Sequence, residues 1–260
     1  MDWRAEGIVI GMRRHGESAA VVELFTPTQG RHVGLVHGGM GRRKRGHLQL
    51  GNSVSAHWRG RLSEHLGTYE LEPKLERAGH VMDKALRLNA LTAACGLLSA
   101  VLPERQAHEV LYEPFVLLLD AIVSADDDDV WPALFVRYEL GMLSELGYGL
   151  DLSACAVTGA QDDLVYVSPR SGRAVSKEAG ADYHDRLLTL PSFLLAKENG
   201  STTRNAIKNA TKEDIAAGFA LTGYFLERHL LKPHGASLPE SRDRLVSRFE
   251  VRTSQAAMRL

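Results

Sequence analysis

Cysteine is scarce in this chain of 260 residues, because Cys95 and Cys155 are the only two. Two cysteines cannot build the disulfide framework that holds many small secreted domains together. No apolar run reaches the ~18 residues that a membrane-spanning helix needs. The N-terminal segment also lacks the basic-then-apolar order and the small-residue cleavage site of a secretory signal. We therefore expect a cytoplasmic protein with a packed core and no membrane partner.

The chain also lacks a net charge of either sign, since 31 Lys and Arg residues are matched by 32 Asp and Glu residues. The distribution is uneven, however. Residues 1–63 contain ten Lys or Arg residues and four acidic residues, so this segment carries +6 and the remainder carries −7. Six of the eleven histidines also precede residue 66. Such asymmetry suggests that one module of the protein presents a nucleic-acid surface.

Residues 1–77 are predicted to form a small β-barrel. Segments rich in Val, Ile and aromatic residues, separated by Gly or Pro, occur at 4–14, 19–26, 30–39, 53–61 and 66–76. In the fourth segment Val54, Ala56 and Trp58 alternate with polar residues, which predicts that all three point into the core. Five short strands in so few residues are typical of the OB-fold.

Residues 78–260 are predicted to form a mainly helical domain, which makes the fold class α+β. Apolar residues recur at three- and four-residue spacing in segments 83–102, 109–124, 126–147 and 211–231. Thr211 is the expected N-cap of the last helix, with Asp214 completing a capping box. Residues 150–185 are expected to be irregular apart from one short strand near 163–169.

The third of these helical segments begins with the acidic run Asp126–Asp129. The run lacks the alternate spacing of a calcium loop, so we attribute it to charge complementarity with the positive end of the helix. Pro132 suits the first turn of that helix, and Gly147 is expected to end it.

Residues 37–47, HGGMGRRKRGH, place four consecutive cations after a Gly-rich segment. The stretch has neither the Gly-x-x-x-x-Gly-Lys-Ser/Thr spacing of a phosphate-binding loop nor a βαβ context. We interpret it as a flexible basic loop beside a barrel groove, as OB-folds use to hold single strands, although a merely solvated charge run is the alternative. A flexible loop cannot hold side chains against base edges, so sequence-independent binding is expected. The candidate DNA-binding residues are Arg13, Arg14, Arg31, Arg42, Arg43, Lys44, Arg45, His57, Arg59 and Arg61.

The chain resembles the RecO family of bacterial recombination-mediator and DNA-repair proteins over nearly its whole length. HGESAAVVELFTPTQGRHVGLVHGG (15–39) is similar to the opening barrel of that family. RYELGMLSELGYGLDLSAC (137–155) resembles its central helix and the cysteine that follows, and VYVSPRSGRAVS (165–176) resembles its SP-x-x-Gly segment. The order and spacing of these motifs, rather than any one of them, make the resemblance specific.

The resemblance implies a non-enzymatic protein without a cofactor, located in the cytoplasm at the nucleoid. Members of this family bind single- and double-stranded DNA and promote strand annealing in recombinational repair. They bind the C-terminal tail of single-strand-binding protein, and with RecR they help to load RecA. An acidic, hydrophobic tail needs an apolar pocket rimmed by cations. Two apolar helical segments supply the candidate residues for this contact: Arg137, Arg228, His229 and Lys232.

Many members of that family carry a four-cysteine zinc site between the central and final helices. The corresponding positions here are Cys155, Thr158, Ser176 and Ala179, so one sulfur remains. Structural zinc needs four thiolate or imidazole ligands, which Thr, Ser and Ala cannot supply. We therefore expect residues 150–185 to form a zinc-ribbon-like insertion that has lost its metal.

Two other function classes stay open at this point: a metal-dependent nuclease and an adaptor that binds only proteins. The sequence has no Gly-x-Ser-x-Gly or His-Glu-x-x-His motif. Its remaining acidic clusters, Asp162-Asp163 and DYHD at 182–185, have no second motif of nuclease type. The +6 charge of the first 63 residues is not what a protein-only adaptor requires. DNA binding without catalysis is the expectation that fits these patterns best.

Overall fold

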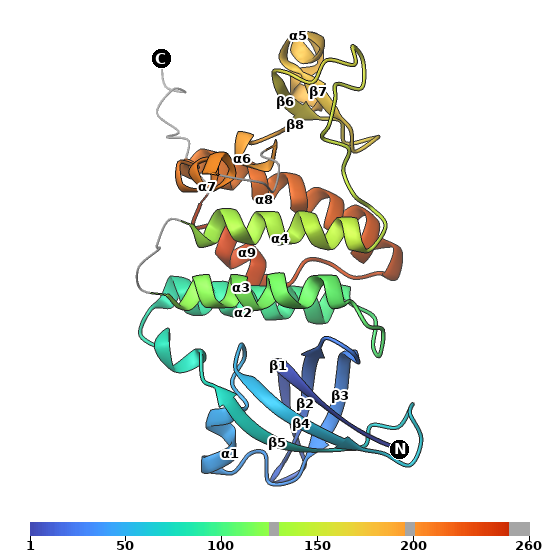
Figure 1. Cartoon of the computed structure of the whole chain (residues 1–260), viewed down its shortest axis with the longest axis vertical. Coiled ribbons are helices and arrows are strands. Elements are labelled where there is room, and N and C mark those ends of the chain that lie inside the picture. Colours follow the sequence, from blue (N-terminus) through green and yellow to red (C-terminus); the bar gives the residue numbers. More distant parts are fainter. Residues whose placement is uncertain (125–129, 196–200, 250–260) are drawn as a thin grey trace, which may run out of the picture. The chain divides into compact units, whose positions relative to one another are not determined.

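The computed structural model describes residues 1–124, 130–195 and 201–249 (Figure 1). Two compact units make up this part of the chain. The first comprises Met1–Trp131 and Leu230–Asp243, and the second comprises Pro132–His229 and the segment that starts at Arg244. Among the residues that the structure describes, no helix is both long and apolar enough to cross a membrane.

The N-terminal part of the first unit is a five-stranded barrel with the strand order β1-β2-β3-β5-β4. The long strand β1 pairs with β4 through its first half and with β2 through its second half. A register shift between Val9 and Gly11 marks the change of partner. A single parallel pair, Leu35 with Thr68, closes the sheet between β3 and β5. The prediction of an OB-like barrel is confirmed. Its strands are β1 Asp2–His15, β2 Ala19–Thr26, β3 Gly30–Val36, β4 Ser53–Arg59 and β5 Thr68–Leu75.

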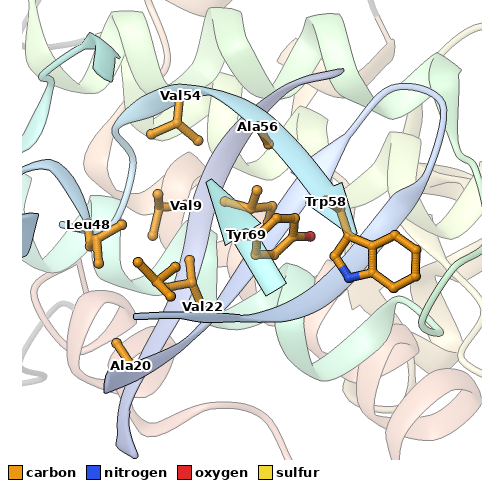
Figure 2. Packing of buried hydrophobic residues seen from close by; sticks show 10 residues of the cluster. Val9, Ala20, Val22, Leu48, Val54, Ala56, Trp58 and Tyr69 are labelled. Atoms are coloured by element: carbon orange, nitrogen blue, oxygen red, sulfur yellow. The ribbon is translucent and has the colours of Figure 1, made fainter. Parts of the chain in front are cut away.

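The barrel core is apolar and aromatic, with Val9, Val54, Ala56, Trp58 and Tyr69 pointing into it (Figure 2). Trp58 is 1% exposed, and its indole Nε1 donates a hydrogen bond to the carbonyl oxygen of Leu66 at 3.0 Å. The predicted alternation of β4 is therefore confirmed, because a slip by one residue would bury its polar side chains instead.

Two helices, α2 (Ala85–Val101) and α3 (Glu109–Val123), pack side by side against the barrel within the same unit (Figure 1). The ring of Phe25 on β2 lies 5.5 Å from that of Tyr112 on α3. Arg77, which is 3% exposed, donates to the Asp120 carboxylate at 2.6 Å and to the Ser53 hydroxyl at 2.6 Å. This buried latch ties the end of β5 to α3 and to the start of β4. A division of the chain at residue 77 stays a prediction.

The second unit contains helices and a small sheet of order β7-β6-β8. The capping box at Thr211 is confirmed, because Thr211 Oγ1 accepts from the amide of Asp214 at 3.1 Å and Asp214 Oδ2 accepts from the amide of Thr211 at 3.0 Å. Gly147, at φ +86°, follows the central helix as predicted. The elements are α4 Trp131–Glu145, β6 Leu164–Val167, β7 Ala174–Ser176, α5 Lys177–Gly180, β8 Leu188–Thr189, α6 Ser192–Leu195, α7 Ser201–Lys208 and α8 Lys212–Leu226.

The end of the described chain continues with a π-helical turn at Glu227–Leu231 and a 3₁₀ turn at Lys232–His234. The last helix, α9, spans Glu240–Val246. Together with the barrel, these helices confirm the predicted α+β class. The zinc-ribbon character of residues 150–185 stays a prediction.

Two local predictions are wrong. The basic run forms a short helix, α1 (Arg42–His47), rather than a flexible loop. None of its residues is buried, so the apolar periodicity that reveals a helix is absent, although Arg and Lys favour helices. Residues 150–185 contain the predicted short strand, which is β6, but they are not otherwise irregular, because β7 and α5 also form there and are too short for periodicity to show in the sequence. The predicted helix start at Asp126–Asp129 lies outside the described residues.

Candidate nucleic-acid interface

Helix α1 carries four cations on the surface of the barrel, in the connection between β3 and β4. All four side chains, from Arg42 to Arg45, are exposed. Residues three apart share one side of a helix, so Arg42 and Arg45 extend on the same side of α1 while the others fan out around it. The helix therefore presents a broad cationic surface rather than a single row.

The turn between β1 and β2 lies next to the segment that leads into α1. The amide of Met40 donates to the carbonyl oxygen of Ser18 at 2.9 Å, and Ala20 is the strand partner of both Arg14 and Val36. The exposed Arg13 and Arg14 at the end of β1 thus join the same end of the barrel as α1. We call this set the α1 basic face. It consists of Arg13, Arg14, Arg42, Arg43, Lys44 and Arg45.

None of these six side chains forms an ion pair with a carboxylate within the described chain. Lys44 Nζ donates to the carbonyl oxygen of His37 at 2.9 Å. Arg14 donates to the carbonyl oxygens of Gly16 and Glu17 at 3.1 and 3.0 Å. Neutral carbonyl partners leave the charges uncompensated, so the α1 basic face carries six positive charges. Positive potential gathered in this way attracts phosphate.

The guanidinium of Arg31 is engaged by contacts within the first unit, so Arg31 is not part of the α1 basic face and its role in DNA binding stays a prediction. Its guanidinium forms an ion pair with Glu23 on β2, lies 3.7 Å from the carboxylate of Glu104, and donates to the carbonyl oxygen of Leu102 at 2.7 Å. Its side chain is only 18% exposed. These contacts join the barrel to the connection that follows α2, so Arg31 stabilises the first unit.

His57 and Arg59 on β4 are also matched by carboxylates. The imidazole of His57 lies 3.2 Å from Asp2 and 3.6 Å from Glu70, and its side chain is 11% exposed. Arg59 lies 3.5 Å from Glu70. Arg61, in the connection after β4, is exposed. The structure thus places these three predicted residues at the opposite end of β1 from the α1 basic face, and two of them lie beside carboxylates.

The residues predicted to bind a protein tail fall in both compact units. Arg228 donates to the Tyr224 hydroxyl at 2.7 Å and its guanidinium carbon lies 5.8 Å from that ring. The ring of His229 stacks on that of Tyr148 at 4.9 Å, and burial, together with Arg228, lowers the pKa of His229. Arg137 is half-buried and donates to the carbonyl oxygen of Phe193 at 3.0 Å. Lys232 belongs to the first unit instead.

The positions that correspond to a zinc site surround the Cys155 sulfur with hydrogen-bond donors. Ser176 donates to it from its amide at 3.3 Å and from its hydroxyl at 3.4 Å. Burial raises the pKa of the Cys155 thiol, but hydrogen bonds from Ser176 and Thr158 outweigh burial and lower the pKa to about 6. Ala179 has no polar side-chain atom. Hydroxyl donors do not fit a structural zinc ion.

The remaining acidic clusters do not assemble into a metal site within the described ranges, where three or more His, Cys, Asp or Glu side chains never converge. His184 instead lies 3.0 Å from Asp185 and 3.0 Å from the carbonyl oxygen of Ala181, both local contacts. Residues 182–185 lie within a 3₁₀ turn, Ala181–Arg186.

Sequence reasoning missed two residues that shape the other end of the barrel. Trp3 on β1 is half-buried and packs against the barrel core. Arg105, in the connection between α2 and α3, donates to the carbonyl oxygen of His65 at 3.1 Å. The sequence of β1 does not distinguish Trp3 from its neighbours. No local sequence pattern predicts that Arg105 contacts the barrel, whose last strand ends thirty residues earlier.

Comparison with known proteins shows which family this chain resembles. The family described as recombination protein O N terminal matches residues 1–73, and recombination protein O C terminal matches residues 83–238. The DNA repair protein RecO of Methylorubrum extorquens is 49% identical over 95% of this chain and 98% of the relative. Those of Rhodospirillum rubrum and Roseobacter denitrificans are 46% and 45% identical, over 96% and 97% of this chain and 96% and 100% of those relatives.

Proposed function

The chain belongs to the RecO family of DNA repair proteins, and from this premise we propose that it binds DNA without sequence preference during recombinational repair. Single- and double-stranded DNA are both ligands, and annealing of complementary strands is the outcome. The protein acts in the cytoplasm, at the nucleoid. The observation that carries the proposal is the α1 basic face, where six exposed cations have no carboxylate partner among the described residues.

The α1 basic face suits phosphate contacts rather than base recognition. Reading a base edge requires side chains held in a fixed orientation, usually as bidentate forks. Arg13, Arg42, Arg43 and Arg45 make no side-chain hydrogen bond to any residue that the structure describes, so nothing there orients their guanidinium groups. Mobile cations bind the sugar-phosphate chain whatever its sequence.

Annealing follows from this charge without a chemical step. Two complementary strands repel each other, and cations bound along their phosphates reduce that repulsion while base pairing supplies the free energy. We therefore propose that the protein is not an enzyme. Labelled single- and double-stranded DNA should stay intact on incubation with the protein and Mg²⁺ or Mn²⁺. Cleavage that depends on the metal would support the nuclease alternative.

We infer the protein partners from membership of the family. We infer that the acidic, hydrophobic tail of single-strand-binding protein docks on the second unit, and that RecR assists in loading RecA. Support comes from Arg228, which lies beside aromatic rings, and from Tyr148, which is 42% exposed and stacks on His229. A cation next to an open aromatic surface suits a peptide that is both acidic and apolar.

The tail proposal is tested by titrating a fluorescent tail peptide onto the protein. Arg228→Ala should weaken binding, while Arg61→Ala, which removes an exposed cation of the barrel instead, should not. Equal losses in the two variants, or none in either, would contradict docking at Arg228.

The DNA proposal is tested by fluorescence titration of a single-stranded oligonucleotide at about 0.1 M salt. Replacing Arg42, Arg43, Lys44 and Arg45 by alanine removes four phosphate contacts. Each contact contributes about 0.7 to the slope of log affinity against log salt concentration. If the variant and the unmodified protein bind equally at 1 M salt, losing four contacts lowers the affinity at about 0.1 M salt by up to about 600-fold.

A matched control removes four exposed cations from the second unit. It replaces Arg170, Lys177, Arg186 and Lys212, and it changes the net charge by the same amount. This variant should bind DNA like the unmodified protein. If both variants lost affinity equally, overall charge rather than the α1 basic face would govern binding. If neither lost affinity, the adaptor alternative would gain support.

A further inference from the structure

A cavity of about 430 Å³ opens at the end of the barrel where β1 begins, away from the α1 basic face. Its aromatic lining comes from Trp3, His32 and Trp58, and its polar lining includes Gln29, Ser63 and Arg105. The volume lies within the range of about 300–1,000 Å³ that is typical of sites for small organic ligands. All of these residues belong to the first compact unit.

Three rings form the wall of the cavity. The indoles of Trp3 and Trp58 are stacked, with centroids 6.1 Å apart and planes at 18°. The ring of His32 meets that of Trp3 edge-on at 5.0 Å. Trp58 is 1% exposed, whereas Trp3 is only half-buried and lines the cavity. Trp3 therefore offers π surface to a ligand while Trp58 supports it from within the barrel.

The wall is uncharged at neutral pH. The His32 imidazole, 3% exposed, lies 2.8 Å from the Tyr69 hydroxyl. Burial lowers the pKa of His32 to about 4, and the positive charge of Arg105 adds to this effect. A neutral aromatic wall favours a neutral planar ligand over a second charged group.

Arg105 is the one cationic side chain in the lining of the cavity. Arg105 has φ +63°, a backbone conformation that few residues other than glycine adopt. Its amide donates to the carbonyl oxygen of Arg31 at 2.7 Å, and its guanidinium donates to the carbonyl oxygen of His65 at 3.1 Å. These contacts hold an exposed guanidinium beside the rings. The one acidic side chain of the lining, Asp2, is hydrogen-bonded to His57 at 3.2 Å.

We propose that this cavity holds one unstacked nucleobase of a bound single strand, in contact with the Trp3 ring. The inference rests on the proposed DNA binding and adds a base site to it. A nucleobase is planar, neutral and polar at its edge, which matches Trp3, Gln29 and Ser63. An adjoining phosphate matches Arg105. Bases within a duplex are paired and stacked, so the cavity favours single strands.

The base site and the α1 basic face can be tested separately because they lie at opposite ends of β1. Trp3 and Arg14 are eleven residues apart, which corresponds to at most about 37 Å along a strand. Removing an aromatic ring takes away no phosphate contact. Variants in the cavity should therefore lower the affinity without changing its salt dependence, whereas variants of α1 should change both.

The experiment titrates an oligothymidylate onto the protein and records both affinity and tryptophan fluorescence. Trp58 and Trp131 are buried, so quenching by a stacked base is expected to come mainly from Trp3. Trp3→Ala should weaken binding by about 5- to 160-fold, the effect of losing one base–aromatic stack. Trp3→Phe keeps a ring, so it should retain most of the affinity while losing most of the quenching.

A second pair of variants tests the base site independently, in case Trp3→Ala fails to fold. Ser63→Phe fills the cavity from an exposed connection and should weaken binding to a similar degree. Leu62→Phe is the matched control, because Leu62 is 46% exposed and does not line the cavity, and it should bind normally.

The outcomes separate the two proposals. Salt-steep binding that Trp3→Ala and Ser63→Phe leave unchanged would refute the base site and keep the DNA proposal. Binding without salt dependence in the unmodified protein would refute the DNA proposal itself. Thymidine monophosphate that quenches Trp3 as tightly as the oligonucleotide would indicate a free-nucleotide site and overturn the strand assignment. Reduced affinity with an unchanged salt slope in both cavity variants supports the base site.

Discussion

The α1 basic face predicts how steeply DNA affinity depends on salt. Each cation that neutralises a phosphate releases a counterion, so the logarithm of the affinity falls linearly with the logarithm of the salt concentration. For single strands the slope is about −0.7 per contact. If all six cations of the α1 basic face contact phosphate, the expected slope is about −4.2. Affinity then falls about 300-fold between about 50 and 200 mM salt.

The variant that lacks the four cations of α1 keeps Arg13 and Arg14. Two contacts correspond to a slope of about −1.4, so its affinity should fall only about 7-fold over the same range. The control variant in the second unit should keep the steep slope. Fluorescence anisotropy of a labelled oligonucleotide, measured at several salt concentrations for each protein, gives all three slopes.

The slope distinguishes contact from general electrostatic attraction. Both four-residue variants change the net charge equally, but only one removes proposed contacts. A slope for the α1 variant that equals that of the unmodified protein would refute the assignment of these cations, even if the affinity itself were lower. Thermal unfolding should be nearly the same for all three proteins, because none of the α1 cations is buried.

Three further predictions concern stability. Arg77→Met should lower the free energy of unfolding, measured by urea denaturation, by about 2–3 kcal/mol, because it leaves the Ser53 and Asp120 partners of the latch unpaired; a loss below about 0.5 kcal/mol would contradict the latch. His32, whose folded-state pKa of about 4 lies below its ordinary 6.5, resists protonation when folded, so stability should fall as the pH drops from 6.5 towards 4, by at most about 3 kcal/mol, and His32→Gln should remove that part of the pH dependence. EDTA should leave the melting temperature unchanged, since one sulfur with hydroxyl neighbours does not make a zinc site; a large drop would show that a metal stabilises the protein.

Features with a strong local signal could be predicted from the sequence. The alternation around Trp58 places it in the core, and the Thr211–Asp214 pair forms the expected capping box. In each case the residues that matter are near neighbours in the chain. The barrel and the long helices follow from the same kind of periodicity.

The sequence could not predict which cations are paired with carboxylates, because the pairing depends on residues that are distant in the chain and close only in the fold. Arg31 is neutralised by Glu23 across the β2–β3 pairing and by Glu104, which is 73 positions further along the chain. His57 meets Asp2 because β4 pairs with the start of β1. A count of positive charges in the sequence therefore overestimates the number of cations that are available to DNA. Strand register decides which cations have no carboxylate partner.

Pockets formed by distant segments escape sequence reasoning for the same reason. Trp3, His32 and Arg105 come from β1, β3 and the connection after α2, yet they line one cavity. No spacing pattern links them.

Arginine footprinting tests the central claim most directly, by asking which guanidinium groups bound DNA covers. The protein is treated with an arginine-specific dicarbonyl reagent, with and without saturating single-stranded DNA, and modification is quantified by mass spectrometry. DNA should protect Arg13, Arg42, Arg43 and Arg45 while leaving Arg170 and Arg186 as reactive as before. Protection of the second pair, with the first group still fully reactive, would contradict the account.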